Sequence, residues 1–278
     1  MRARERGIAL ASVLWGMAAL SLIAAAMLSS SMNAVHVARN EWTQLRADTE
    51  ADSAVQLAIL SLFDPRMERR LPVDGSSEKL TVNGDPVTVS IQDEAGRIDV
   101  NYASRNFLRD LFKSAGATDA DALADRVVDW RSVKGTHSLN GATAGDYRHA
   151  GYAYVPRGGA FQSVSEVGLV MGMTPDLFAR LEPALTVYSH SPYVDARIAP
   201  RQALMAIPGM DADKANLMVA GRGYGSEAVA AYFAVANPAG HAFTITADAS
   251  IGGAQASRKA VIMVSGDPTH PVIGLDWK

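Results

Sequence analysis

The chain of 278 residues contains no cysteine. This absence excludes disulfide bonds, thiolate metal sites and a cysteine nucleophile. A strong charge of either sign is also missing, because 26 basic and 29 acidic side chains leave a formal net charge of −3. Nucleic-acid-binding proteins usually gather positive charge, so the composition does not favour that class. A chain of this length can bury a core without disulfides, which permits a location outside the cytosol.

Lysine, arginine, aspartate and glutamate are absent from Gly7 to Val35. About 20 predominantly apolar residues suffice for a helix to cross the hydrocarbon core of a bilayer. Arg2, Arg4 and Arg6 precede the run, and the positive-inside rule keeps such residues in the cytoplasm. The sequence therefore predicts that the part after Val35 lies across the membrane.

Glycine and proline are absent from Met17 to Asp64. After Val35, apolar side chains recur at spacings of three and four residues between charged ones, which is typical of an amphipathic helix. Pro65 follows, and its ring cannot continue a helix. We therefore predict one continuous helix, with a first half that suits lipid and a second half that packs on a folded domain. The alternative is a signal peptide removed near Ala34, which would release a soluble exported protein.

Alternating apolar and polar residues predict strands on both sides of a helical middle. Asn83-Gly84 stands between two alternating runs and predicts a hairpin, because both residues accept positive φ. We place a second reversal at residues 94–96, followed by a third strand of the same antiparallel meander that reaches Val100. The chain returns to strands in residues 242–251, 257–266 and 270–278. These can pair with the first strands only if the two ends of the insertion lie close together, and we expect one sheet that is split in sequence.

The middle of the chain has helical patterns and an internal repeat. We expect Thr118 to cap one of these helices, and residues 132–161 to form a long loop. The segment "IDVNYASRNFL" aligns with "VDARIAPRQAL", so that Asp99 corresponds to Asp195. Such similarity is typical of duplicated packing units.

Several stretches in order resemble the minor pseudopilin K family of type II secretion systems. They are "RERG" before "IALASVLWGMAAL", "RIDVNYAS", "DW", "FQSVSEVGLVMGM", "VDARIAPRQALMAIPGM" and the final "GLDWK". The resemblance implies an α+β fold in which a long N-terminal helix packs on a small antiparallel sheet that a large all-α insertion interrupts. It implies a leader (1–7), the helix (8–64), a first part of the sheet (65–104), the insertion (105–225) and a second part of the sheet (226–278).

The resemblance also implies processing and a place in a filament. Prepilin peptidase would cut between Gly7 and Ile8 and leave the helix as an inner-membrane anchor, with the new N-terminus methylated. Ser12 would be the fifth mature residue, where most pilins carry a glutamate that neutralises the N-terminal amine of the subunit ahead. A subunit without this glutamate fits the tip of the periplasmic pseudopilus. The expected partners are the minor pseudopilins I and J, the other pseudopilins of the filament, the peptidase and membrane lipid.

Calcium binding is a property of the resembled family, in an acidic loop after "DW". Here Ser132 and Lys134 stand at positions where that loop is acidic, and only Asp129 and Asp146 remain as candidate ligands. Calcium prefers six to eight oxygen ligands. We therefore expect no calcium site of the family's strength, and no other metal or cofactor. His137 and His149 near Asp146 are read as solvated loop residues.

The competing function is DNA binding by a membrane-anchored periplasmic protein. "ALMAIPGMDADKANLMVAGR" resembles a helix-hairpin-helix, in which a hairpin and a helix N-terminus hold a phosphate. Asp211 stands where the hairpin would need a second glycine, so we interpret the element as a packing motif and expect no nucleic acid. Its expected interior residues are Leu204, Ile207, Leu217 and Val219. "GRGYG" follows a helix rather than a strand, and Ser165 with Glu166 forms no triad, so no enzyme is expected.

Overall fold

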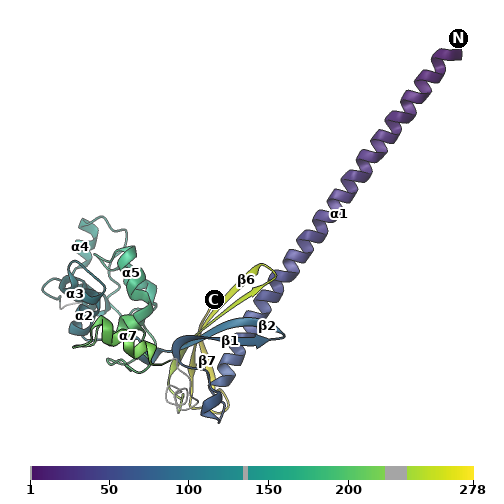
Figure 1. Cartoon of the computed structure of the whole chain (residues 1–278). Helices are drawn as coiled ribbons and strands as arrows, with labels where there is room; N and C mark the ends of the chain where they lie inside the picture. Colours follow the sequence, from purple (N-terminus) through teal and green to yellow (C-terminus); the bar gives the residue numbers. More distant parts are fainter. Residues whose placement is uncertain (1, 134–136, 223–236) are drawn as a thin grey trace.

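The computed structural model describes residues 2–133, 137–222 and 237–278 (Figure 1). A rod-like helix leads to a five-stranded antiparallel sheet, and a helical unit projects from the side of that sheet. The strands are β1 (Asp74–Val82), β2 (Asp85–Asp93), β3 (Ile98–Asp99), β4 (Leu185–Thr186), β5 (Ala242–Ile251), β6 (Ala254–Val264) and β7 (Val272–Trp277). The helices after the rod are α2 (Arg105–Ser114), α3 (Ala120–Arg131), α4 (Ala144–His149), α5 (Pro175–Leu181), α6 (Arg201–Leu204) and α7 (Ala212–Ala220). These elements confirm the predicted fold class.

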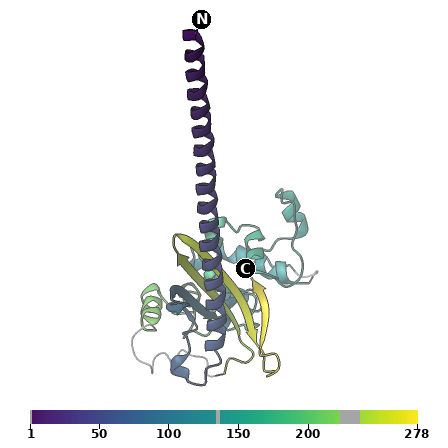
Figure 2. The ribbon, with the colours of Figure 1, turned by 90° about the vertical axis from the view of Figure 1, so that its right-hand side faces the viewer.

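Helix α1 runs without a break from Arg2 to Ser61. Its last part lies across one face of the sheet (Figure 2), mainly against β5 and β6. Small side chains on one stripe of this part are fully buried: Ala47, Ala51, Ala54 and Ala58. They let the helix approach the sheet closely, and larger side chains beside them, such as Val55 and Leu62, fill the remaining core. Pro65 follows the end of the helix, as the sequence predicts.

The sheet has the order β1-β2-β5-β6-β7, so the strands from both ends of the insertion pair directly. Strand β2 pairs antiparallel with β5, with Ile91 opposite Ile245. The β1–β2 hairpin turns at Asn83 and Gly84, whose φ values are 50° and 95°. The predicted hairpin is therefore confirmed, and so is the pairing across the insertion.

The prediction that a third strand after residues 94–96 continues the first antiparallel meander is wrong. A single 3₁₀ turn, η2 (Glu94–Gly96), follows β2, and the short strand β3 then pairs parallel with β4 instead of antiparallel with β2. Residues 65–104 thus contribute only β1 and β2 to the large sheet. The alternation Ile98–Val100 reflects burial in the helical unit, because both side chains belong to that unit's core. Period-two burial alone does not say which sheet a strand joins.

The helical unit has its own hydrophobic core, separate from the core between α1 and the sheet. Short 3₁₀ turns η3 (Val164–Leu169) and η4 (Glu182–Ala184) link its helices. Asp119, not Thr118, caps α3, since its carboxylate accepts a hydrogen bond from the Ala122 amide. The predicted loop 132–161 contains α4, which begins with a capping box between Thr143 and Asp146. The predicted insertion ends at 225 and the second part of the sheet begins at 226, both outside the described residues.

Candidate functional site: membrane helix, sheet junction and helical unit

The first half of α1 has no packing partner within the described part of the chain. Its large apolar side chains are exposed, including Trp15 at 79% and Leu22 at 71%. The helix is long and apolar enough to cross a membrane, judged by length and composition. A serine is compatible with this apolar helix surface, because the Ser21 hydroxyl donates a hydrogen bond to the Met17 carbonyl at 2.8 Å. A helix with apolar side chains all round needs lipid or other helices around it.

The predicted processing residues lie at the start of this helix. The backbone of Gly7 and Ile8 is helical, and their side chains are outside the described part. Ser12 is also helical, and its side chain is exposed. The structure tests neither cleavage nor methylation, so the predictions for these three residues stand as they are.

Ion pairs connect α1 to the sheet near residues 46–52, where the exposed half of the helix ends and the packed half begins. Arg258 of β6 donates to Asp48 at 2.8 Å and to Asp52 at 2.9 Å. On the other side, Arg46 pairs with Asp85 at 2.6 Å. Such partly exposed pairs contribute little individually, but they link α1 to two different strands, β2 and β6. The direction in which the exposed half of α1 leaves the globular part is therefore set by these contacts.

The junction between the sheet and the helical unit carries a buried carboxylate. Asp93, at the end of β2, is fully buried and accepts a hydrogen bond from the Ala95 amide. Its other oxygen lies 2.7 Å from Nδ1 of His241, just before β5. The hydrogen bond to Asp93 raises the pKa of His241 despite partial burial. Asp195, in the helical unit before α6, donates its backbone amide to the Ala95 carbonyl. The end of β2, the segment before α6 and the start of β5 thus meet at this junction.

In the structure, each copy of the internal repeat is bound by one arginine in the same way. Arg131, at the end of α3, donates from both terminal nitrogens to carbonyls one and four residues after Asp99. Arg222, just after α7, donates in the same way to carbonyls one and four residues after Asp195, each at 2.7 Å. The alignment of Asp99 with Asp195 is therefore structural. No sequence pattern identifies these two arginines as repeat partners, because the groups that they bind are backbone carbonyls.

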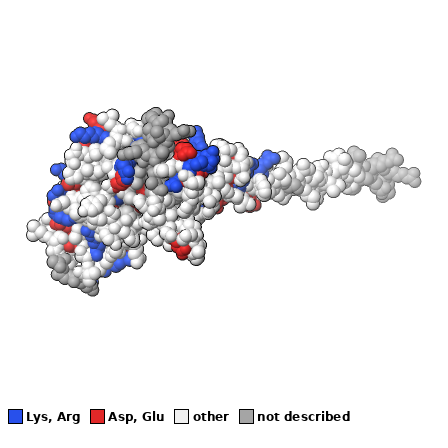
Figure 3. Space-filling view, turned by 90° about the horizontal axis from the view of Figure 1, so that it is seen from below, with Lys and Arg blue, Asp and Glu red and all other residues white. Residues whose placement is uncertain are grey.

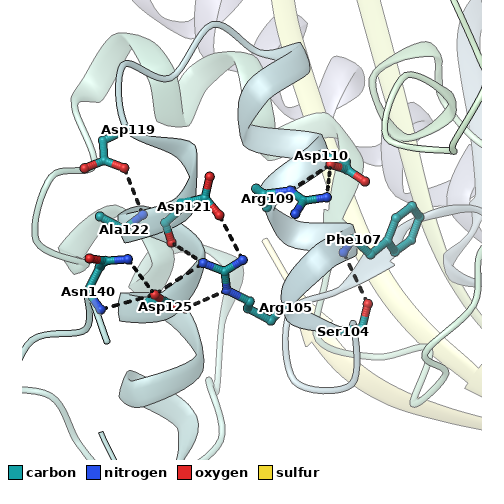
Figure 4. Close-up of polar contacts among 10 residues, drawn as sticks. All are labelled: Ser104, Arg105, Phe107, Arg109, Asp110, Asp119, Asp121, Ala122, Asp125 and Asn140. Carbon is teal, nitrogen blue, oxygen red and sulfur yellow. Dashed lines mark hydrogen bonds and ion pairs between the residues drawn. The ribbon is translucent and has the colours of Figure 1, made fainter. Parts of the chain in front are cut away.

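A second arginine in each repeat joins its two helices. Figure 4 shows Arg105 of α2 reaching Asp121 and Asp125 of α3, with N–O distances of 2.8 and 2.7 Å. In the second copy, Arg201 of α6 donates to the Asn216 side chain of α7 at 2.6 Å. The hydrogen bond from Arg105 holds the pKa of Asp125 below its usual range. The first copy is thus bound by charge and the second by a weaker, partly neutral contact.

Around Trp130 the helical unit packs aromatic rings. Its indole stacks on Phe161 with centroids 5.9 Å apart, and Tyr147 of α4 lies at the same distance on another side. Tyr147 is fully buried and accepts a hydrogen bond from the Met171 amide. Burial raises its pKa to about 12. Residues of the predicted long loop, Tyr147 and Phe161, therefore pack into this core.

The two candidate calcium ligands already have local partners. Asp129 is buried and accepts hydrogen bonds from the amide and hydroxyl of Ser138. Asp146 accepts from the amide and hydroxyl of Thr143, and these bonds lower its pKa. Lys134 lies outside the described residues. Among the residues described, no group of three or more His, Asp or Glu side chains could hold a metal ion.

In the hairpin before α7, the Asp211 side chain blocks the position at the helix N-terminus where an anion would bind. Asp211 caps α7 by accepting a hydrogen bond from the Lys214 amide at 2.8 Å. The Lys214 ammonium pairs with the same carboxylate at 3.1 Å, and these bonds lower the pKa of Asp211. The space at this helix N-terminus that a phosphate would need is thus occupied by Asp211. Basic and acidic side chains also intermingle on the face shown in Figure 3.

The predicted interior of this hairpin is partly wrong. Leu204 is fully buried and Ile207 partly so, but Leu217 is 73% and Val219 38% exposed. The buried side of α7 is marked by Ala215 instead. Residues 223–225 of "GRGYG" lie outside the described part.

Residues 88–190 match the family model described as "Type II secretion system (T2SS), protein K". The middle of the chain is therefore similar to this family. A curated Type II secretion system protein K from Pectobacterium carotovorum subsp. carotovorum is 28% identical over 209 residues. That alignment covers 66% of this chain and 63% of the relative, so the chain matches a little under two thirds of the relative's length.

The fold is also similar to a solved structure. The match is to a chain in the crystal structure of the GspK–GspI–GspJ complex from the enterotoxigenic Escherichia coli type 2 secretion system. It has a TM-score of 0.51 and 14% identity, and it covers 89% of this chain and 98% of the other. The likeness shows a shared fold over most of the chain. Together with the protein K domain, it confirms the resemblance that the sequence motifs indicate.

Proposed function

We propose that this protein is a minor pseudopilin of a type II secretion system, and that it has a structural role rather than an enzymatic one. The observation that carries the proposal is a protein K domain mounted on a helix of membrane-spanning length. We infer that the helix anchors the protein in the bacterial inner membrane with a single pass. The sheet and helical unit then lie in the periplasm, as the arginines at the N-terminal end of the helix favour.

We place the protein at the tip of the pseudopilus. Head-to-tail contacts that do not close generate an open filament, so any subunit with a large obstruction ends its growth in one direction. The helical unit projects sideways from the sheet, away from the line of α1 (Figure 1), and it would obstruct a further subunit. Ser12 supports the same position, since a tip subunit has no amine ahead for a carboxylate to neutralise.

The proposed partners are minor pseudopilins I and J, because the fold relative was crystallised with GspI and GspJ. Prepilin peptidase would act between Gly7 and Ile8. Calcium at family strength is not part of the proposal, because Asp129 and Asp146 are engaged with Ser138 and Thr143. Neither a soluble adaptor nor a DNA-binding protein explains the protein K domain together with the unbroken helix.

The test is co-purification of the full chain with pseudopilins I and J of the same system, co-expressed in membranes. A tag on the C-terminal end of this chain is expected to retain both partners after detergent extraction. The same tag on a major pseudopilin is the control for adhesion between exposed membrane helices. Recovery of this chain without I and J, or equal recovery with the control, would overturn the proposed assembly.

A further inference from the structure

A cleft of about 640 Å³ lies between the outer face of the sheet and the helical unit. Its floor is polar: Ser90 of β2 stands opposite Thr246 of β5, and Gln92 stands opposite Thr244. The residues that alternate with these, such as Ile91, face the core under α1. The cleft is therefore on the side of the sheet that α1 does not cover. We call it the sheet–helix cleft.

Three arginines line this cleft, and each comes from a different segment. Arg97 lies between η2 and β3, Arg201 begins α6, and Arg222 follows α7. Asp74, at the start of β1, is the acidic side chain in the lining. Three positive charges against one negative charge give the lining an excess of positive charge. A concave surface with one sign of charge concentrates counter-ions.

Arg222 is a buried cation without a direct counter-ion in the part of the chain that the structure describes. Its exposed fraction is 7%, and its terminal nitrogens donate to backbone carbonyls rather than to a carboxylate. Asp74 and Asp195 act on it only as nearby charges, and burial lowers its pKa. Burying a charge without a counter-ion is costly, so an anion in the cleft would stabilise this side chain.

Arg97 has an unused donor in the same lining. Its Nη1 pairs with Glu94 at 3.0 Å, but its Nε is shielded from solvent and has no acceptor among the described residues. Such unsatisfied buried donors are uncommon. Arg201 adds a largely exposed guanidinium at the helical side of the cleft. An excess of positive charge, hydroxyl groups and an unused N–H group are thus combined in one cavity.

We propose that the sheet–helix cleft binds a carboxylate, carried by an acidic peptide segment or by a small polycarboxylate. Guanidinium groups suit carboxylates because their N–H donors match the two oxygens of the ligand. Hydroxyl groups of Ser90 and Thr246 supply further donors on the floor. The volume lies within the range of ligand pockets, about 300–1,000 Å³. This site is separate from the exposed half of α1 and does not depend on the proposed function.

The test is calorimetric titration of the full chain in detergent with citrate and, separately, with a short peptide rich in Asp and Glu. The same peptide with Asn and Gln is the uncharged control. Arg201→Gln removes one charge from the lining, and Thr246→Glu places a negative charge on the floor. Arg109→Gln is the matched control, because Arg109 pairs with Asp110 on α2 and does not line the cleft. Circular dichroism verifies that each variant is folded, and Arg222 is left intact because it also holds backbone carbonyls.

Binding of either acidic probe, weakened about tenfold or more by both cleft variants and unchanged by Arg109→Gln, would support the site; each charge-assisted contact is of that order. Citrate alone or the acidic peptide alone would identify the source of the carboxylate. The proposal is overturned if neither probe binds, if the uncharged peptide binds equally well, or if Arg109→Gln weakens binding as much as the cleft variants do.

Discussion

The sheet with α1 and the helical unit are each stabilised by a different kind of contact. Between α1 and the sheet, alanines such as Ala54 and Ala58 meet Val, Ile and Phe side chains, and the polar contacts lie at the margin. In the helical unit, large aromatic rings around Trp130 fill the centre, and arginines tie helices and carbonyls together. The first arrangement allows a close, extended contact along one helix. The second forms a self-contained core, which explains how a long insertion can interrupt the sheet without disturbing its pairing.

The largest expected effect is in the helical core. Trp130→Ala removes a side chain that is 3% exposed and should lower the free energy of unfolding of the helical unit by about 3–5 kcal/mol. Chemical denaturation followed by tyrosine and tryptophan fluorescence measures this change. Trp277→Ala is the matched control, because Trp277 is 47% exposed at the edge strand β7, and its change should be much smaller. Equal losses in the two variants would contradict a separate aromatic core.

The contact of α1 with the sheet should respond to added volume. Ala58→Leu places three more carbon atoms where the side chain is fully buried, and overpacking typically costs about 1–3 kcal/mol. Ala24→Leu, in the exposed half of the same helix, makes the same chemical change with no neighbour in the sheet. Hydrogen exchange should show faster opening of β5 and β6 in the first variant only. Unchanged exchange in Ala58→Leu would show that the contact is looser than described.

The ion pairs between Arg258 and α1 should contribute less to the free energy of unfolding than the buried contacts do. Arg258→Gln removes the pairs with Asp48 and Asp52, and partly exposed pairs of this kind contribute about 0.2–1 kcal/mol each. The loss should shrink at high salt, because screening already weakens the pairs in the parent protein. Thermal unfolding at low and high ionic strength measures both effects. A loss that does not depend on salt would assign the role of Arg258 to packing.

The junction should give the smallest effect, and it should depend on pH. The hydrogen bond to Asp93 raises the pKa of His241 above that of the unfolded chain. The stabilisation is therefore fully present below the unfolded pKa of about 6.5 and is lost as pH rises through the folded pKa. Between about pH 6 and pH 8, the urea midpoint should fall more in the parent than in His241→Gln. His270→Gln, at an 82% exposed side chain, is the control, and identical slopes in all three proteins would contradict the assignment.

Sequence patterns predicted what depends on neighbours along the chain. The unbroken helix up to the region of Pro65 and the Asn83–Gly84 hairpin follow from local periodicity and positive φ, and both are confirmed. The capping box of Thr143 and Asp146 has the pattern Thr-x-x-Asp, but it lies in a Gly- and Ala-rich stretch and was not predicted. The exposed Leu217 was assigned to the interior because a short helix offers too few residues to locate its buried side.

Contacts between residues far apart in the chain could not be predicted from local sequence patterns. The parallel partner of β3 lies almost ninety residues further on, as Ile98 pairs with Leu185, and nothing in either short strand identifies the other. Arg222 binds carbonyls, which every residue possesses, so no pattern marks its partners. The sheet–helix cleft likewise arises from segments that meet only in the folded chain.

The proposal as a whole is tested most directly at the N-terminus of the protein in its own membranes. Intact-mass measurement with N-terminal sequencing should find a chain that starts at Ile8, carries one added methyl group and retains the whole of α1. A start near Ala34 would mean that the helix is removed as a signal peptide, and it would contradict the assignment of this protein as an anchored minor pseudopilin.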